Sequence, residues 1–249
     1  MQWNADCLRT KSLELKDRLQ QDDIDICLIQ ETKMTIKDKP SFPGYTIVRA
    51  DRKHLAGGGL LTLIKSSLVF EKLDSLSLDV TESQSIKVRL GKNRWLYLTN
   101  VYVPPAHSKG HKLIKLRADS IPSFSSSLIC GDFNGHSPLW DDSQPTDDRG
   151  EELLDWILEK NLTIMNDGSH SRINKATGNS STPDLSLCGK LWQNKFDWST
   201  GECIGASDHL PIYINIHSKT NHQSVFGKIP RWRSNAVSYT HLTLPTRKL

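Results

Sequence analysis

The chain has 249 residues, of which 37% are hydrophobic, and a formal net charge of +4. This length supports one well-buried core and is short for two ordinary domains. No apolar run of about 18 residues is present, and the opening residues lack the charged and apolar regions of a signal peptide, which argues against membrane-spanning and secreted classes. We therefore expect an intracellular protein with no membrane partner.

Short apolar segments rich in β-branched residues recur along the chain and predict strands. They lie at residues 3–6, 24–30, 60–64, 85–90, 95–103, 127–130, 162–165, 184–187 and 212–216. Apolar residues at helical spacing predict a helix over residues 10–20 and a weaker one near 112–118. Asp148 and Glu151 have the spacing of a capping box and predict a helix over residues 149–159. Strands outnumber helices in mixed order, which favours two packed sheets with helices outside.

Two stretches between these elements have no periodic apolar pattern. Gly57 to Gly59 lack a following Lys-Ser or Lys-Thr and precede a strand, so they predict a flexible hairpin turn rather than a phosphate-binding loop. Residues 170–181 are polar and carry no strand signal. We expect this second stretch to be a loop.

Positive charge is concentrated at the C-terminal end of the chain. Six Lys and Arg residues and no Asp or Glu follow His217, so residues 1–217 hold the other 26 of 32 basic residues against 28 acidic ones, a balance of −2. DNA binding by this part would need local basic patches or a cation that offsets its carboxylates. Residues 218–249 read as a polar basic linker, and VSYTHLTLPTRKL at 237–249 resembles a translated sequencing adaptor rather than a native segment.

The five cysteines do not suggest a structural metal or a disulfide framework. Their number is odd and no C-x-x-C pair occurs. Cys27 and Cys130 lie inside apolar runs, so we expect buried, reduced thiols.

Oxygen- and nitrogen-bearing side chains recur at predicted strand ends. They are Asn4, Glu31, Tyr102, Asp132, Asn134, Asp184, Asp208 and His209. Hard divalent cations prefer oxygen ligands, and phosphodiester cleavage needs a positioned water and stabilisation of the developing charge. Each residue alone also fits a structural explanation: Asn4 as a turn cap, Glu31 as a solvated carboxylate, and Tyr102 as a half-buried core aromatic. Asp208 and His209 equally fit a surface pair.

The order of these motifs gives them a joint meaning. W-N near the start, Q-E-T, N-x-Y-x-P, G-D-F-N and S-D-H follow one another across residues 1–217. In this order they resemble the endonuclease/exonuclease/phosphatase superfamily, which includes apurinic-site endonucleases and DNase I. GDFNGHSPLWDD, DRGEELLDWI, TPDLSLC and SDHLPI resemble the endonuclease domains of non-LTR retrotransposon polyproteins, and KIPRW resembles their connection to the reverse transcriptase.

The resemblance implies a DNase I-like fold over residues 1–217, a four-layered α-β-β-α sandwich with two central mixed β-sheets. It implies an endonuclease that nicks double-stranded DNA with Mg²⁺, or Mn²⁺ as a substitute. The nick would leave a 3′-hydroxyl that primes reverse transcription of the element RNA by the polyprotein's reverse transcriptase domain. The site of action would be nuclear, and the isolated domain is expected to be monomeric. In relatives the first strand begins further ahead of W-N, so we expect a shortened opening strand.

The resemblance also implies a metal-binding role for three of these residues. Glu31, supported by Asn4, would hold Mg²⁺ against a phosphate oxygen, and Asp208 would lie near the metal. Ser207, which completes S-D-H, would help to position the loop. Asp6 matches a position that is acidic only in some relatives.

Five further residues would act on the phosphate and the water. Asp132 would orient or deprotonate the attacking water, and Asn134 would fix its geometry. His209 would stabilise the phosphate charge while Asp184 accepts its ring proton and orients the imidazole. Tyr102 would donate a hydrogen bond to the phosphate.

Weaker candidates for DNA contact lie outside these motifs. Arg52, Lys53 and His54 form a compact basic turn that fits phosphate contacts and equally a solvated turn. Trp140 fits stacking on DNA, and it also fits packing of the loop after Asn134 onto the core. Two other functions stay open: a phosphatase of the same superfamily, and a decayed element copy that binds DNA without cutting it.

Overall fold

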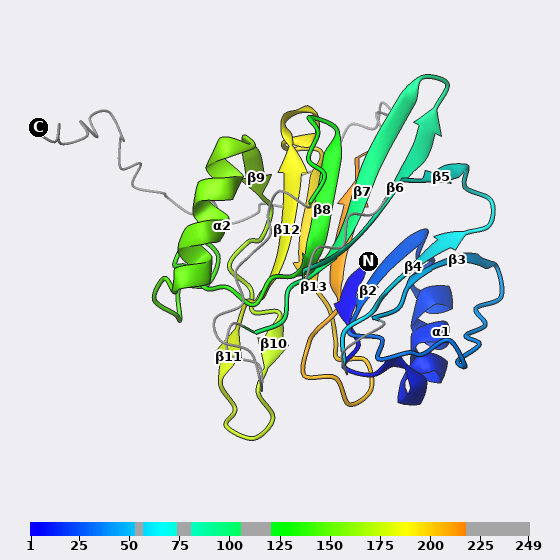
Figure 1. Ribbon diagram of the computed structural model, residues 1–249, viewed down its shortest axis with the longest axis horizontal. Helices are drawn as coiled ribbons and strands as arrows, with labels where there is room; N and C mark the ends of the chain where they lie inside the picture. Colours follow the sequence, from blue (N-terminus) through cyan, green and yellow to red (C-terminus); the bar gives the residue numbers. More distant parts are fainter. Residues whose placement is uncertain (53–56, 74–80, 106–120, 218–249) are drawn as a thin grey trace, which may run out of the picture. The chain divides into compact units, whose positions relative to one another are not determined.

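Two six-stranded sheets form the framework of the protein, as seen in a computed structural model that describes residues 1–52, 57–73, 81–105 and 121–217 (Figure 1). The first sheet has the strand order β13-β14-β1-β2-β4-β3. These strands are β13 (Phe196–Thr200), β14 (Ile212–Ile216), β1 (Gln2–Asn4), β2 (Ile26–Gln30), β4 (Leu60–Lys65) and β3 (Tyr45–Ala50). β1 and β2 run parallel and the other neighbours antiparallel, so the sheet is mixed.

The second sheet has the strand order β5-β6-β7-β8-β12-β9. These strands are β5 (Phe70–Lys72), β6 (Glu82–Gly91), β7 (Arg94–Tyr102), β8 (Ser127–Asp132), β12 (Asp184–Gly189) and β9 (Leu162–Ile164). Only β7 and β8 pair in parallel in this sheet. A separate hairpin joins β10 (Arg172–Ile173) to β11 (Ser180–Ser181).

Alternating side chains of the first sheet bury one face under helix α1 (Ser12–Gln21) and the other against the second sheet. Cys27 and Ile29 of β2 lie in one buried cluster with Leu15 and Leu19 of α1. Leu28, between them in sequence, lies in a different cluster with residues of the second sheet. This period of two is the ordinary consequence of strand geometry.

The second sheet repeats this arrangement with helix α2 (Asp148–Glu159). Ile129 of β8 packs with Leu153 and Trp156 of α2, whereas Leu128 and Cys130 face the first sheet. The layers are therefore α1, first sheet, second sheet and α2, visible in Figure 1 as two helices outside the strands. The predicted α-β-β-α sandwich with two mixed sheets is confirmed.

The start of α2 differs by one residue from its predicted cap. Asp147, not Asp148, is the N-cap, and its side chain accepts a hydrogen bond from the Gly150 backbone N–H at 2.6 Å. Gly150 is required here because an added Cβ would lie 1.9 Å from the His136 carbonyl oxygen. The predicted helix over 149–159 is otherwise confirmed.

Several short strands carry too little local signal to be predicted. β3, β5 and β13 were not expected, and the expectation that residues 170–181 hold no strand is wrong, because Arg172 pairs with Ser181 and Ile173 with Ser180. The polar strands β10 and β11 form because they pair with each other, and they have no apolar face from which they could have been predicted. The predicted hairpin turn at the glycines is confirmed, since β3 and β4 on either side of it pair antiparallel. The predicted helix near 112–118, and residues 218–249, lie outside the described residues.

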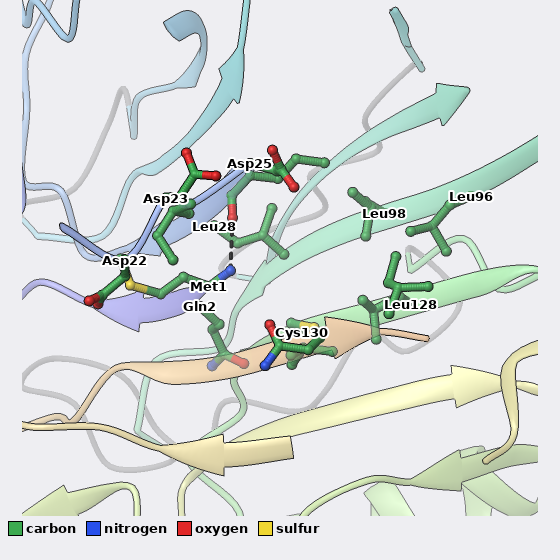
Figure 2. Close-up of a pocket in the computed structure, with 15 residues that line it drawn as sticks. Met1, Gln2, Asp22, Asp23, Asp25, Leu28, Leu96, Leu98, Leu128 and Cys130 are labelled. Atoms are coloured by element: carbon green, nitrogen blue, oxygen red, sulfur yellow. Dashed lines mark hydrogen bonds between the residues drawn. The ribbon is translucent and has the colours of Figure 1, made fainter. Parts of the chain in front are cut away.

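A cavity of about 300 Å³ opens at one end of the space between the sheets, lined by Leu28, Leu96, Leu98 and Leu128 and by polar residues that include Gln2 and Asp25 (Figure 2). The Met1 ammonium donates to the Ile26 carbonyl oxygen at 2.8 Å beside this cavity. β1 is only three residues long, so Ile26 of β2 extends beyond the part of the strand that β1 pairs with.

The same space is polar toward the ends of β2 and β7. Gln30 donates to the Asn100 side-chain oxygen at 2.6 Å, and Asn100 donates to the Ile29 carbonyl oxygen at 3.1 Å. Thr62 donates to Gln84 at 2.5 Å. These buried side-chain hydrogen bonds join the first sheet to the second.

Candidate active site

Ends of strands from both sheets meet at one place. Tyr102 and Asp132 are register partners at the ends of β7 and β8, and Asp132 is also the partner of Asp184 at the start of β12. Asn4 ends β1, and Glu31 directly follows β2. The structure therefore gathers side chains that are up to 180 positions apart in sequence, from Asn4 to Asp184.

Asn4 links the two sheets across this junction. Its fully buried side-chain amide donates to Asp132 Oδ2 at 2.8 Å and to Glu31 Oε1 at 3.1 Å. Its Oδ1 accepts from the Asp6 backbone N–H at 3.0 Å. Because both carboxylates require the donor end of the amide, this orientation is fixed by chemistry. As placed, Asn4 holds two carboxylates together.

A buried carboxylate-histidine pair lies beside Asp132. Asp184 Oδ2 is 2.7 Å from His209 Nδ1 and accepts a second hydrogen bond from Ser171 Oγ at 2.7 Å. Gln2 Nε2 lies 3.4 Å from the other Asp184 oxygen. Ser207 Oγ accepts from the His209 backbone N–H at 3.1 Å, which holds the histidine backbone in place.

Charge at this pair favours an imidazolium. Burial by itself would lower the pKa of His209, but the negative charge and hydrogen bond of Asp184 outweigh it and raise that pKa to about 9. His209 is therefore cationic at neutral pH and points Nε2 toward Asp208, whose Oδ1 is 3.8 Å away.

The carboxyl group of Asp132, in contrast to the His209 imidazole, lies among other negative charges. Burial, and then the charge of Asp184, raise the pKa of Asp132 to about 7, although His209 opposes the shift. Asp132 Oδ1 accepts the backbone N–H of Asn134 at 3.0 Å. A carboxyl group with a pKa near neutrality can accept a proton and release it again.

Two residues frame Asp132. Asn134 has a positive φ of 48° and donates its side-chain amide to the Val103 carbonyl oxygen at 3.0 Å. Burial, together with the charges of Glu31 and Asp132, raises the pKa of Tyr102, so its hydroxyl stays protonated and forms a hydrogen bond with Glu31.

Ion pairs between basic residues and carboxylates of the site lie on its outer side. Arg172 Nε donates to Asp208 Oδ2 at 2.8 Å, which ties the β10–β11 hairpin to the loop that carries His209. The Ile173 backbone N–H also donates to the Asp208 carbonyl oxygen at 2.8 Å. Lys33 Nζ is 3.3 Å from Glu31 Oε2.

The donor set fits a hard cation. Asp132, Asp184 and His209 offer ligand atoms that all lie within 4.8 Å of one another, a spacing that could hold a metal ion. Glu31 adds a carboxylate on the other side of Asn4, and its charge also raises the pKa of Asp132. A site rich in carboxylate oxygens suits Mg²⁺ or Mn²⁺ better than softer metals. His209 Nδ1 and Asp184 are already hydrogen-bonded to each other, and each oxygen of Asp132 accepts a hydrogen bond from Asn4 or Asn134.

The other site residues predicted from the sequence lie in different surroundings. Ser207 Oγ donates to the Asn4 carbonyl oxygen at 2.8 Å, so it joins the S-D-H loop to β1. Trp140 is 1% exposed and donates to the Gly135 carbonyl oxygen at 3.1 Å, which places it in the core as loop packing. Arg52 is largely buried against Glu82 rather than in a solvated turn. Lys53 and His54 lie outside the described residues.

Sequence reasoning missed Ser171, Gln2 and Glu82. Ser171 sits in the polar stretch before β11, where nothing in the local pattern separates it from neighbouring serines. Gln2 has no charge, and Glu82 precedes the predicted limit of its strand. Only alternation along β6 offered a signal for Glu82, because it continues the strand toward Tyr102.

No helix within the described ranges has the length and apolar character needed to cross a membrane. None of the five cysteines forms a disulfide. Cys27 and Cys130 are buried, as predicted, whereas Cys203 is exposed.

Comparison with known proteins finds similarity to proteins of mobile elements. Residues 96–213 match the family described as endonuclease-reverse transcriptase. The RNA-directed DNA polymerase from mobile element jockey of Drosophila melanogaster is 27% identical over 227 residues, covering 87% of this chain and 23% of that protein. The chain thus spans about a quarter of the length of this curated relative.

Solved structures share the fold. The endonuclease domain of TRAS1, a telomere-specific non-LTR retrotransposon, matches with a TM-score of 0.70 at 21% identity, over 86% of this chain and 95% of that domain. The AP endonuclease LMAP from Leishmania major matches with a TM-score of 0.70 at 14% identity, over 87% of each chain. These matches confirm the DNase I-like fold. With the family match and the jockey relative, they confirm the resemblance to retrotransposon endonucleases.

Proposed function

We propose that this chain is a member of the endonuclease/exonuclease/phosphatase superfamily, that it is the endonuclease domain of a non-LTR retrotransposon polyprotein, and that it nicks double-stranded DNA with Mg²⁺. The observation that carries the proposal is the junction where Asn4 joins Glu31 to Asp132 beside the Asp184–His209 pair. One side of this junction offers carboxylates for a hard cation. The other offers a cationic imidazole for a phosphate.

The chain's own residues divide the chemistry of hydrolysis. Asp132 orients the attacking water and takes its proton, which its pKa of about 7 permits. Asn134 holds Asp132 in place through its backbone N–H. The imidazolium of His209, kept charged and oriented by Asp184, stabilises the negative charge that develops on the phosphate. Tyr102, held neutral by its surroundings, donates to a phosphate oxygen.

Glu31 and Asp208 are the residues we assign to the metal, with Asn4 orienting Glu31. Mg²⁺, or Mn²⁺ in its place, would supply positive charge to the phosphate and to the leaving oxygen when bound. In-line attack of water then forms the new P–O bond and breaks the bond to the 3′ oxygen. The departing 3′ oxygen takes up a proton and becomes a 3′-hydroxyl, and the phosphate remains on the 5′ end.

The polarity of this cleavage connects the site to retrotransposition. A free 3′-hydroxyl on the target strand can prime a polymerase. The jockey relative is named as an RNA-directed DNA polymerase. We therefore propose that the partners are the double-stranded target, the element RNA and a reverse transcriptase domain of the same polyprotein, acting in the nucleus.

The test is cleavage of supercoiled plasmid with Mg²⁺, with and without chelator, followed by extension of the nicked product by a DNA polymerase. Chelator-sensitive nicking, with ends extended before any phosphatase treatment, is expected. Asp132→Asn is the inactive comparison. Extension only after removal of a 3′-phosphate would overturn the polarity. Hydrolysis of a phosphoinositide or sphingomyelin headgroup, with plasmid left intact, would instead favour a phosphatase, and DNA binding without nicking would favour a decayed copy.

A further inference from the structure

Arg52 and Glu82 form an almost closed ion pair beside the site. Their side chains are 13% and 11% exposed, and Arg52 Nε donates to Glu82 Oε1. The other Glu82 oxygen accepts the backbone N–H of Gly59 at 2.7 Å. Surface ion pairs are commonly loose, but one enclosed on both sides holds a single geometry. Arg52 is thus held in a defined place just beyond the end of β3.

The glycine run before β4 is shaped to this arginine. Gly58 has a φ of 62°, and a Cβ added to it would lie 2.3 Å from the guanidinium carbon of Arg52. Gly57 has a similar φ of 81°, yet no atom in the described part of the chain lies within 4 Å of a Cβ added there. The two glycines therefore share the left-handed backbone, but only Gly58 is needed for space.

The guanidinium lies over the ring of Tyr102. The guanidinium carbon is 5.4 Å from the ring centroid. Glu82 is the register partner of Tyr102 across β6 and β7, so the carboxylate that holds Arg52 lies next to Tyr102 in the second sheet. Arg52 Nη2 is buried and has no hydrogen-bond partner among the described residues, so the guanidinium does not present its fork to solvent. The guanidinium is therefore placed to contact the Tyr102 ring and not a DNA phosphate.

We propose that the Arg52–Glu82 pair positions Tyr102 for the phosphate, a role that rests on the proposed nuclease function. The guanidinium restrains one face of the ring, so the hydroxyl cannot swing away from the junction with Asp132. Its positive charge also withdraws electron density from the ring and makes the hydroxyl a better donor. Glu82 and Gly58 act through Arg52 by fixing where that charge sits.

A double-mutant cycle tests this route. Arg52→Met is expected to lower kcat for plasmid nicking by about tenfold, with KM little changed, which is the size of a partly desolvated cation–π contact. In the Tyr102→Phe background the same change should cost less than about twofold, because the hydroxyl it serves is gone. An equal loss in both backgrounds would overturn the proposal, since Arg52 would then act without Tyr102.

The glycines supply a matched pair of variants. Gly58→Ala introduces a methyl group where the guanidinium lies, so it should reproduce the kcat loss of Arg52→Met. Gly57→Ala imposes the same backbone strain in open space and should leave kcat unchanged. Equal kcat values for the two glycine variants would overturn the role of Gly58 and of the fixed guanidinium.

A spectroscopic measurement keeps the proposal separate from the nuclease activity. With ring-labelled tyrosine, the ¹³C resonance that vanishes in Tyr102→Phe should shift in Arg52→Met and Gly58→Ala but not in Gly57→Ala. A parent protein that fails to nick DNA would refute the proposed function alone, and this resonance would then decide the positioning role. A Tyr102 signal unmoved by Arg52→Met would overturn it.

Discussion

Replacing Asn4 by Ala should reveal how much the junction depends on one amide. The change removes hydrogen bonds to Asp132 at 2.8 Å and to Glu31 at 3.1 Å, and the acceptor for the Asp6 backbone N–H at 3.0 Å. Asn4 is fully buried, so water does not replace these partners without a change in packing. The two carboxylates would remain close together without a donor between them.

The size of the loss follows from these contacts. Hydrogen bonds to charged groups contribute about 1.5–3 kcal/mol each and neutral ones about 1 kcal/mol. Taking the lower value for both carboxylate bonds, we expect a loss of about 4 kcal/mol in the free energy of unfolding without metal. For a domain of this size this corresponds to a fall in Tm of roughly 8–16 °C.

Thermal unfolding in chelator and in excess Mg²⁺ provides the assay. The loss should be smaller with Mg²⁺, because the cation then offsets the charges that Asn4 no longer bonds. Asn100→Ala is the control, since Asn100 is equally buried and makes its hydrogen bonds to Gln30 and to backbone, away from the carboxylates. Its loss should not depend on Mg²⁺. A greater loss for Asn4→Ala with Mg²⁺ than without it would refute the reasoning and make the Asn4 oxygen a metal ligand.

Three further outcomes test the rest of the site. Glu31→Gln should abolish nicking and change the free energy of unfolding in chelator by no more than about 1 kcal/mol, because a charge is lost without a change of shape. Activity within about twofold of the parent would show that Glu31 is not a metal ligand. Ser171→Ala should lower the single-turnover rate constant of nicking by about threefold to tenfold, since Asp184 loses one hydrogen bond that orients it. An unchanged rate constant would leave Ser171 with a structural role only. Deleting residues 218–249 should leave Tm nearly unchanged and weaken DNA binding at low salt, because six positive charges are removed; a large fall in Tm would contradict the predicted boundary.

Local sequence determined those elements whose pattern is complete within a few residues. The apolar run ending at Gln30 predicted β2, and the helical spacing after Asp147 predicted α2. The motifs around Glu31, Asp132 and His209 could be found because each joins a strand signal to a chemically distinctive side chain. Their order along the chain indicated the superfamily, and with it the layered fold.

Tertiary structure alone decided how these side chains meet. The bond from Asn4 to Asp132 crosses from one sheet to the other over 128 positions, and the bond from Ser171 to Asp184 depends on a hairpin with no apolar pattern. Arg52 was equally compatible with a DNA contact and a solvated turn until the register of β6 and β7 put Glu82 and Tyr102 beside it. The physical reason is that a period of two or 3.6 specifies which face of an element is buried. It does not specify which distant strand will lie against that face, and at this site the chemistry depends on that choice.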